Sequence, residues 1–349
     1  MRKFDYSIFK ESSWDNKLVN LLSRIHEQKG RLQSFFTQDS EKLEKLVEIA
    51  KIQSTESSNE IEGIRTTDTR IRQLVNEKTT PRNRDEEEIA GYRDALNVIH
   101  ENFNLISITP NFILQLHKIM MSHTSASHGG KFKNIQNYIS AVDRKGKAHT
   151  LFTPLSPFKT PIAMQELCDE YNRISGDGMV DPLVLIPIFI HDFLCMHPFI
   201  DGNGRMSRLL TTLLLYRSDY HVGKYISLES KIAKNKDLYY NALRESQIGW
   251  HDNRDDVTPF AIFLLGTIAS AYDDIEERAE LMFERNSAIE IVRKATKTKI
   301  GKFTKADIME LIPSISSTSI ERSLKALCDA GEIRKEGSGR ATCYIRTKQ

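Results

Sequence analysis

The sequence predicts a mainly α-helical protein with one small β-hairpin and a C-terminal winged helix-turn-helix unit. Apolar residues recur at helical spacing over most of its 349 residues, as in helices that pack one face into a core. Two short strand-like stretches flank a turn signal at residues 143–146. Near the C-terminal end, a basic segment has the order helix, helix and glycine-containing ribbon, which is typical of a winged helix-turn-helix.

The composition is that of an ordinary globular protein, long enough for two or three compact units. Hydrophobic residues make up 40% and charged residues 28%, and the net charge of +2 indicates no polyanionic partner for the chain as a whole. We expect a cytoplasmic protein without membrane contact. No signal-peptide pattern opens the sequence, and the longest apolar run, residues 182–196, contains a charged His191-Asp192 pair. Four cysteines without CxxC spacing are expected to be reduced: Cys168, Cys195, Cys328 and Cys343.

Helices account for the first part of the chain. Residues 14–51 carry apolar side chains at helical spacing. The stretch STESSNEIEGI then ends a helix at Gly63 and places Ser58 and Glu62 four residues apart. A glutamate near a helix C-terminus is slightly unfavourable with the helix dipole, so Glu62 either lies in water or has a partner elsewhere.

A hairpin interrupts the helical pattern near the middle of the chain. Two helices, over residues 85–100 and 111–121, precede it. Its strands are expected within residues 134–142 and 148–155. Helices resume near Ala163.

Two apolar helices surround the sequence HPFIDGNGR, residues 197–205. Asp181-Pro182 marks the start of the first, as an N-cap residue followed by proline. Nearly every residue after it is apolar, so this helix should be buried. Pro198 ends it, and the second apolar helix is expected after Gly204. A later acidic helix is expected over residues 273–284.

The C-terminal segment differs in charge from the rest of the chain. From Glu290 onward it holds 13 Lys and Arg against 7 Asp and Glu, which suits contacts to phosphate. Residues 318–330 are expected to form the recognition-type helix and residues 337–339 the turn of the wing. The predicted domains are an N-terminal helical region (1–84), a central domain (85–285) and the winged helix (286–349).

The loop HPFIDGNGR has the properties of a phosphate site. Gly202 and Gly204 let the backbone approach a ligand closely. They lie where a helix begins, so unpaired N–H groups and the positive end of the helix dipole face the same space. Arg205 and Arg208 are three residues apart on the first helical turn, and their guanidinium groups can hold a polyphosphate tail.

Asp201 and His197 add a metal ligand and a base. Asp201 would repel phosphate unless Mg²⁺ lies between them, and one carboxylate with phosphate oxygens and waters is a normal Mg²⁺ site. His197 follows the buried helix and is placed to take a proton from a hydroxyl. The loop is therefore expected to transfer a phosphorus group from a nucleotide to a hydroxyl. The alternative is a capped helix–loop–helix whose side chains only satisfy backbone groups.

The sequence HPFIDGNGRMSR, residues 197–208, resembles the signature HPFx(D/E)GNGRxxR of the Fic family at every defined position. The resemblance covers about residues 43–268 and implies a Fic-fold helical bundle with a hairpin flap. Most Fic proteins transfer AMP from ATP to a Ser, Thr or Tyr hydroxyl of a target protein, and the same is expected here, also on the chain itself, with release of pyrophosphate. The implied site consists of the base His197, the Mg²⁺ ligand Asp201, the core residue Phe199, an anion hole of Gly202, Asn203 and Gly204, and Arg205 and Arg208 on the phosphate tail.

The segment from Ser58 to Gly63 resembles the Fic inhibitory motif (S/T)xxxE(G/N). In that family the glutamate pairs with the second arginine of the signature, which is Arg208 here. A carboxylate bound to Arg208 would occupy the place of the γ-phosphate. The resemblance therefore implies that Glu62 inhibits the site in cis.

The resemblance also implies a partner site and an adenine site. The hairpin near residues 135–152 resembles the Fic flap, which would pair with an extended segment of the target protein. A plain surface hairpin is the alternative. Residues 236–243, KDLYYNAL, resemble the segment near the adenine, with Tyr239 and Tyr240 as an aromatic face and Gln247 as an amide nearby. For the two tyrosines, core packing is the alternative.

Two residues near these motifs are given no catalytic part. Lys133 stands where relatives have arginine in a GxxR-like stretch, so no role is assigned to it. His191 lies six residues before His197, a poor spacing for two ligands of one metal, and is expected to pack or to support the site. The sequence contains no HExxH, Walker A or zinc-finger spacing.

Two other functions stay open. The same site could hydrolyse AMP from a modified target, with Glu62 orienting the water. The basic winged helix could bind DNA, although winged helices also serve as protein–protein modules and as homodimer contacts.

Overall fold

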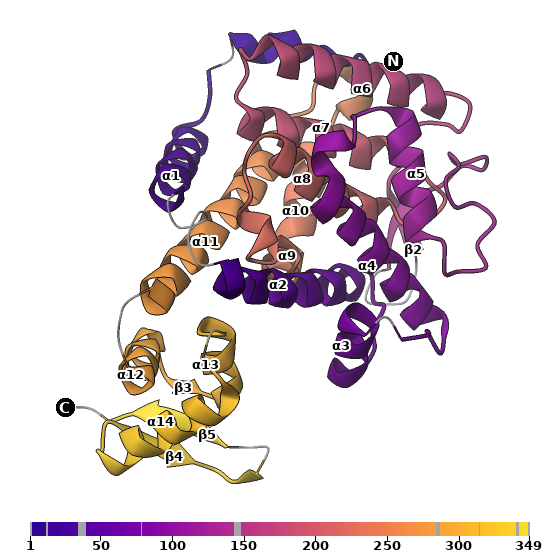
Figure 1. Cartoon of the computed structure of the whole chain (residues 1–349). Coiled ribbons are helices and arrows are strands. Elements are labelled where there is room, and N and C mark those ends of the chain that lie inside the picture. The colour runs from indigo at the N-terminus through magenta and orange to yellow at the C-terminus, as the bar shows by residue number, and fades with distance from the viewer. Residues whose placement is uncertain are drawn as a thin grey trace. The chain divides into compact units, whose positions relative to one another are not determined.

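The computed structural model of the chain describes residues 2–11, 13–33, 40–77, 79–142, 148–283, 287–313, 315–339 and 342–347. It confirms the mainly α-helical fold expected from the sequence (Figure 1). The chain divides into two compact units, one of residues 1–29 and 49–271 and the other of residues 30–48 and 272–349. Each unit is described by itself. The domain boundaries after residues 84 and 285 stay a prediction.

The elements before the hairpin are the 3₁₀ helix Tyr6–Lys10, α1 (Asn16–Leu32), α2 (Ser40–Ile61), α3 (Asp68–Asn76), α4 (Arg84–Asn102), the 3₁₀ helix Phe103–Leu105 and α5 (Pro110–Met120). The hairpin consists of β1 (Ile139–Val142) and β2 (Ala148–Phe152), which pair antiparallel. After it come α6 (Thr160–Asp177), α7 (Pro182–Met196), α8 (Asn203–Arg217), the 3₁₀ helix Val222–Lys224, α9 (Leu228–Lys234), α10 (Lys236–Ser246), the 3₁₀ helix Trp250–Asp252 and α11 (Thr258–Phe283).

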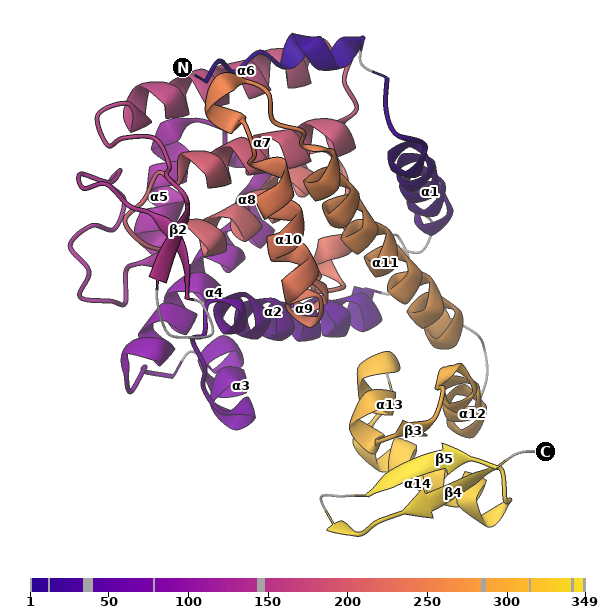
Figure 2. The same cartoon turned by 180° about the vertical axis from the view of Figure 1, so that it is seen from behind.

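The core of the first unit is built around α7. Helices α6, α7 and α8 are stacked in that order (Figures 1 and 2), and α4 packs on α8 and on α5. Every residue of α7 from Leu183 to Met196 is buried, as its uniformly apolar sequence predicts. Asp181 caps the helix by accepting the N–H of Leu183 at 2.8 Å. Both ends of α7 are therefore where the sequence predicts them, which fixes where the HPFIDGNGR loop begins.

The structure corrects three boundaries predicted from the sequence. The acidic helix expected over residues 273–284 is the second half of α11, which starts at Thr258 because Pro259 suits a first turn and the following apolar residues are buried. Helix α8 begins at Asn203, with the left-handed Gly202 as its N-cap, and not after Gly204. Strand β1 begins only at Ile139, because the segment before it bonds to other loops. The expected turn over residues 143–146 lies outside the described residues.

The N-terminal segment is tied to α7 by a buried ion pair. Arg2 donates from Nη2 to Asp192 at 2.7 Å and from Nη1 to Asp255. The Asp192 carboxylate also accepts the Tyr6 hydroxyl at 2.7 Å and the Trp250 indole N–H at 2.6 Å. Four donors thus converge on two carboxylates, and Asp192 is fully buried among them.

His191 lies beside this cluster. Its Nδ1 is 3.7 Å from Asp255 and its Nε2 is 3.4 Å from Sγ of Cys195. Together with Asp192 and Asp255 it could place three ligand atoms around one cation, but the Arg2 guanidinium already bridges the two carboxylates. The arrangement fits the packing role expected for His191.

The second unit has one core of its own. It contains α12 (Ala288–Thr298), β3 (Lys302–Phe303), α13 (Lys305–Leu311), α14 (Ser317–Asp329), β4 (Ile333–Glu336) and β5 (Cys343–Arg346). The strands form an antiparallel sheet in the order β3-β5-β4. Helix α14 covers the expected recognition-type helix, and Gly337 and Gly339 of the expected wing have φ of +76° and +57°. The assignment of this unit as a winged helix stays a prediction.

Two further expectations concern the environment of the chain. All four cysteines are free, with Cys168 and Cys195 buried. Across the described ranges, no helix has both the length and the apolar character needed to cross a membrane.

Candidate active site

The HPFIDGNGR loop starts with a strained residue. His197 is the C-cap of α7, with φ of +51° and ψ of +62°, and its N–H bonds to the carbonyl of Phe193 at 3.0 Å. A left-handed conformation at a residue with a Cβ costs about 1–2 kcal/mol, and such strain persists where the surroundings enforce it. The backbone of His197 is therefore held by contacts from outside the loop.

Two of the groups that hold the loop were given no role from the sequence. The buried His117 of α5 stacks on Phe199 with a ring separation of 3.7 Å. Its Nε2–H donates to the carbonyl of Asp201 at 3.1 Å, while Nδ1 accepts the N–H of Gly130 at 3.0 Å. Burial lowers the pKa of His117 to about 4, which keeps this donor–acceptor pattern fixed at neutral pH. The second group is Lys133, whose Nζ bonds to the carbonyl of Met196 at the end of α7 and whose backbone N–H bonds to the carbonyl of Pro198 in the loop.

The His197 side chain has the tautomer that a general base needs. Its Nδ1 lies 3.2 Å from the carbonyl of Leu194, and since a carbonyl only accepts, Nδ1 carries the proton. The lone pair is then on Nε2. Burial lowers the pKa of His197 to about 4, so the ring is neutral at pH 7 and can accept a proton.

The first turn of α8 forms the anion site. Gly202, with φ of +80°, lets the chain enter the helix, and the first N–H groups of α8 have no partner within the helix. The Asn203 side chain is committed elsewhere, because it accepts the N–H of Phe199 at 2.9 Å and donates to the carbonyl of Phe199 at 2.8 Å. Its contribution to an anion hole is therefore its backbone N–H. Phe199 itself is fully buried, as expected.

A carboxylate lies against this anion site. A Cβ built at Gly204 would collide with Oε1 of Glu62, so the missing side chain at position 204 is what lets the carboxylate approach. The same Oε1 accepts from Nη2 of Arg208 at 2.8 Å. Arg208 also donates from Nε to Oγ and from Nη2 to the carbonyl of Ser58, both at 2.8 Å. The structure thus brings together Ser58, Glu62, Gly204 and Arg208, as the two motifs predict.

Arg208 keeps one group unused in this arrangement. It is 3% exposed, and its Nη1 has no hydrogen-bond partner among the described residues. The same nitrogen lies 3.4 Å from the position of a Cβ at Gly204. A buried guanidinium N–H without a partner, beside a helix N-terminus, suits a further oxygen of an anion.

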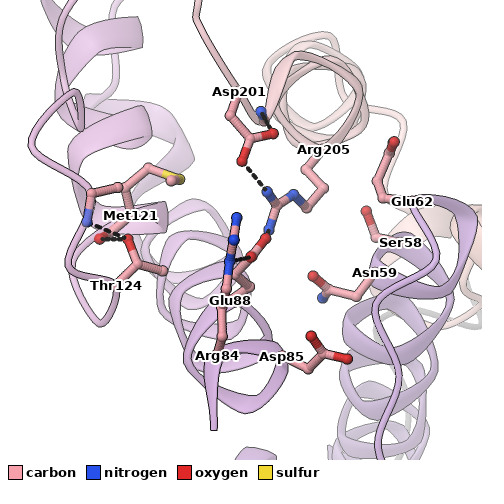
Figure 3. Close-up of polar contacts among 12 residues, drawn as sticks. Ser58, Asn59, Glu62, Arg84, Asp85, Glu88, Met121, Thr124, Asp201 and Arg205 are labelled. Atoms are coloured by element: carbon pink, nitrogen blue, oxygen red, sulfur yellow. Dashed lines mark hydrogen bonds and ion pairs between the residues drawn. The ribbon is translucent and has the colours of Figure 1, made fainter.

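The arginine at the end of the loop, Arg205, pairs with carboxylates. Arg205 pairs through Nη1 with Glu88 at 2.8 Å and through Nη2 with Asp201 at 3.7 Å. Glu88 also accepts from Nε of Arg84 at 2.9 Å. Figure 3 shows this chain of charges between α4 and the loop, with Ser58 of α2 and Glu62, which follows the end of α2, on another side. Arg205 therefore lines the cavity and is ion-paired with Glu88, while its Nε and Nη1 have no hydrogen-bond partner within the described residues.

Asp201 has the surroundings of a divalent cation ligand. Its side chain is 45% exposed and lines the cavity. One carboxylate oxygen accepts the N–H of Gly202 at 2.6 Å, and the other is only loosely paired with Arg205. One accessible carboxylate beside an anion site fits Mg²⁺, which takes few protein ligands and completes its shell with phosphate and water.

A cavity of about 860 Å³ unites these groups, a size that suits a nucleotide. Its walls come from the loop, from α10 and from the hairpin, where Ile139, Ser140 and Leu151 contribute. The predicted adenine residues Tyr239, Tyr240 and Gln247 all line it. Tyr239 is buried and packs on Phe263 with a ring separation of 5.6 Å, while Tyr240 is 43% exposed. Tyr240 is the aromatic face open to a ligand, and Tyr239 supports it from the core.

Comparisons with known proteins find similarity to Fic proteins. The model of the Fic/DOC family matches residues 107–215, which include the loop. The proteins named protein adenylyltransferase Fic from Drosophila yakuba and Drosophila willistoni are each 29% identical over 178 residues, which are 51% of this chain and 31% of the relative. The chain thus matches these curated relatives over about a third of their length.

Solved structures share the fold. A Fic family protein from Desulfovibrio desulfuricans G20 has a TM-score of 0.60 at 20% identity, over 97% of this chain and 98% of that one. A Fic domain containing signaling protein from Bacteroides thetaiotaomicron has a TM-score of 0.62 at 24% identity, over 76% of this chain and 97% of that one. At these identities the likeness shows the fold alone, and that fold is the one found in Fic proteins.

Proposed function

Because the chain carries a Fic/DOC domain at residues 107–215, we propose that it is a protein adenylyltransferase. It moves AMP from ATP to a Ser, Thr or Tyr hydroxyl of a target protein, and of itself, and releases pyrophosphate. The observation that carries this proposal is that one cavity is lined both by His197 with a free Nε2 and by the anion site at the start of α8. The names of the relatives support the same reaction.

The chemistry follows from the positions of these groups. Nε2 of His197 takes the proton of the target hydroxyl as its oxygen bonds to the α-phosphorus. The bond between the α-phosphorus and the bridging oxygen breaks, and pyrophosphate leaves with that electron pair. The α8 N-terminus and Arg208 hold the phosphates, and Tyr240 and Gln247 face the adenine of ATP. Asp201 would hold Mg²⁺, which neutralises phosphate charge when bound.

We further propose that Glu62 inhibits this reaction in cis. Its carboxylate bonds to Arg208 and lies where Gly204 leaves room for an anion. A terminal phosphate of ATP needs the same guanidinium and the same N–H groups, so the two compete. Inhibition by Glu62 thus follows from substrate mimicry: a carboxylate stands where a phosphate must bind.

The hairpin is the proposed docking site of the target protein. Strands β1 and β2 form a two-stranded sheet, and residues 139, 140 and 151 line the cavity. An extended segment added to such a sheet would carry its hydroxyl toward His197. The free cysteines suit a reducing compartment, and we propose a cytoplasmic location.

The reaction is tested with ATP labelled at the α- or the γ-phosphate and with Mg²⁺. Glu62→Gly should label itself or lysate proteins from the α position only, and the label should vanish in Glu62→Gly/His197→Ala. Glu60→Gly is the matched control, because Glu60 is exposed near the end of α2 and its side chain pairs with Arg65. Label from the γ position would contradict AMP transfer, and equal labelling by wild type and Glu62→Gly would contradict the inhibition.

Hydrolysis of AMP from a modified protein is the alternative use of this site. It would employ His197 and Glu62 in the same cavity, and it differs in the substrate consumed. An AMP-modified protein offered to the wild-type chain separates the two, because only the hydrolase releases AMP in the absence of pyrophosphate.

The charges of the C-terminal unit support DNA binding less than its basic sequence suggests. On α14, the exposed Arg322 and Lys325 alternate with the exposed Glu321 and Asp329. In the wing, Glu336 pairs with Lys302 and Arg334 at 2.8 and 2.7 Å. Part of the basic excess is thus neutralised within the unit. Binding to duplex DNA that falls steeply with salt would restore this function as a candidate.

A further inference from the structure

A short segment before the hairpin bonds to four consecutive carbonyl groups, the last one of α7 and the first three of the loop. Lys133 Nζ donates to Met196 at 3.0 Å, and the Lys133 backbone N–H donates to Pro198 at 2.9 Å. Asn137 Nδ2 donates to His197 at 3.2 Å and to Phe199 at 2.9 Å. Every main-chain oxygen from Met196 to Phe199 therefore accepts from one of these two residues.

Lys133 occupies an unusual position for a lysine. It is 3% exposed, and its ammonium group bonds to the carbonyl of Met196 and to Oδ1 of Asn137 at 2.9 Å. No carboxylate ion pair to it occurs within the described part of the chain. Burial lowers the pKa of Lys133 to about 8.

The C-terminus of α7 explains why a cation is kept there. The last carbonyls of a helix lack partners and carry the negative end of the dipole. Met196 is the last residue of α7, and the residue after it is the left-handed His197. Lys133 thus satisfies the helix end at the point where the backbone strain begins.

We propose that Lys133, together with Asn137, is a positioning residue that holds His197 in its left-handed conformation with Nε2 in the cavity. The inference rests on the proposed function of His197. From the sequence alone, Lys133 has no predicted role. The segment leads directly into β1, two residues after Asn137, so the base of the hairpin and the catalytic base are fixed by the same contacts.

The geometry predicts a loss in the chemical step and not in nucleotide binding. Lys133 and Asn137 are not among the residues that line the cavity, so they do not contact the nucleotide site. A side chain that is misplaced by about 1 Å lowers catalysis by about 100-fold. We therefore expect Lys133→Met to lower kcat by about 10–100-fold and to leave the KM for ATP unchanged.

The kinetic test uses the Glu62→Gly background, where the site is free. Lys133→Met is compared with Lys133→Arg, which keeps a donor and a charge, and with Lys131→Met as the matched control. Lys131 is exposed, and its Nζ bonds to the carbonyl of Ser127 outside the loop. The proposal is supported if Lys133→Met lowers kcat, Lys133→Arg restores most of it, and Lys131→Met leaves kcat unchanged. Unchanged kcat, or a rise in KM alone, overturns it.

A second readout does not depend on transferase activity. In ¹⁵N-histidine NMR spectra, His197 should show the single Nδ1–H tautomer, with its signals assigned by their loss in His197→Ala. Lys133→Met should give a mixture of tautomers, because the Nδ1–H bond to Leu194 depends on the loop backbone. An unchanged tautomer overturns the positioning role. If Glu62→Gly transfers no AMP, the proposed function fails, and this readout still decides the role of Lys133.

Discussion

Replacing Arg2 by methionine tests whether charge ties the N-terminal segment to α7. Arg2 bridges Asp192 and Asp255, whose side chains are 0% and 6% exposed. Removing one partner of a buried ion pair costs about 3–5 kcal/mol, because the other charge stays buried. Tyr6 and Trp250 still donate to Asp192 after the change. We therefore expect Arg2→Met to lower the free energy of unfolding by about 3 kcal/mol, at the lower end of that range.

The charge itself is isolated by a double-mutant cycle. In the Asp192→Asn variant, removing Arg2 leaves no unpaired buried charge at position 192. Arg2→Met should therefore lower the free energy of unfolding by less in this variant. A coupling of about 2 kcal/mol is expected for a pair in contact. Lys3→Met is the matched control, since Lys3 is exposed beside Arg2, and it should change stability by less than about 0.5 kcal/mol.

Urea unfolding followed by tryptophan fluorescence measures these energies. The chain has two tryptophans, Trp14 and Trp250, and both lie in the unit that contains Asp192. The reasoning is refuted if Arg2→Met costs no more than Lys3→Met. It is also refuted if the cost of Arg2→Met is the same with aspartate or asparagine at position 192.

Three further predictions concern the site and its pH dependence. Ser58→Ala removes one of the two hydrogen bonds from Arg208 to Ser58. Labelling with α-labelled ATP should therefore rise less than in Glu62→Gly. An equally large rise would show that the proposed inhibition by Glu62 depends entirely on the Ser58 hydroxyl. In the Glu62→Gly background, a Cβ at position 204 lies 3.4 Å from Nη1 of Arg208 and takes up space at the anion site. Gly204→Ala should therefore weaken ATP binding measured by calorimetry, and unchanged binding would disprove the assigned anion site. Burial lowers the pKa of His100 to about 3 and of His191 to about 4, from 6.5. The unfolded chain therefore takes up these protons first, and the free energy of unfolding should fall between pH 6.5 and 4, by up to about 1.4 kcal/mol per pH unit for each histidine. A urea midpoint that is independent of pH over this range would count against both burials.

The framework of the site could be predicted because its signals are local. Asp181 and Pro182 start α7, Pro198 forces its end, and Gly202 permits the turn into α8. These signals depend on the residues themselves and on their immediate neighbours. The pairing of Glu62 with Arg208 joins residues 146 positions apart, and the sequence indicates it only through the resemblance of two motifs.

The supporting residues could not be predicted, because their roles arise from tertiary contacts. Lys133 and His117 look like a surface lysine and a helix histidine until the loop folds onto them. Arg205 has the spacing of a phosphate ligand, but Glu88 of α4 reaches it first. The first half of α11 was not predicted from the sequence, although Pro259 suits a first helical turn and apolar residues follow it.

The absence of a side chain at Gly204 matters both to the Glu62 carboxylate and to a phosphate that binds in its place. Any larger residue there meets Glu62 and Arg208 at once, so a mutation that expels the inhibitor from within the hole also excludes the substrate. A change at Glu62, just after the end of α2, removes the carboxylate and leaves the hole intact. Under the proposed inhibition, a substitution inside the hole therefore acts on both the carboxylate and the phosphate, whereas a substitution at Glu62 acts on the carboxylate alone.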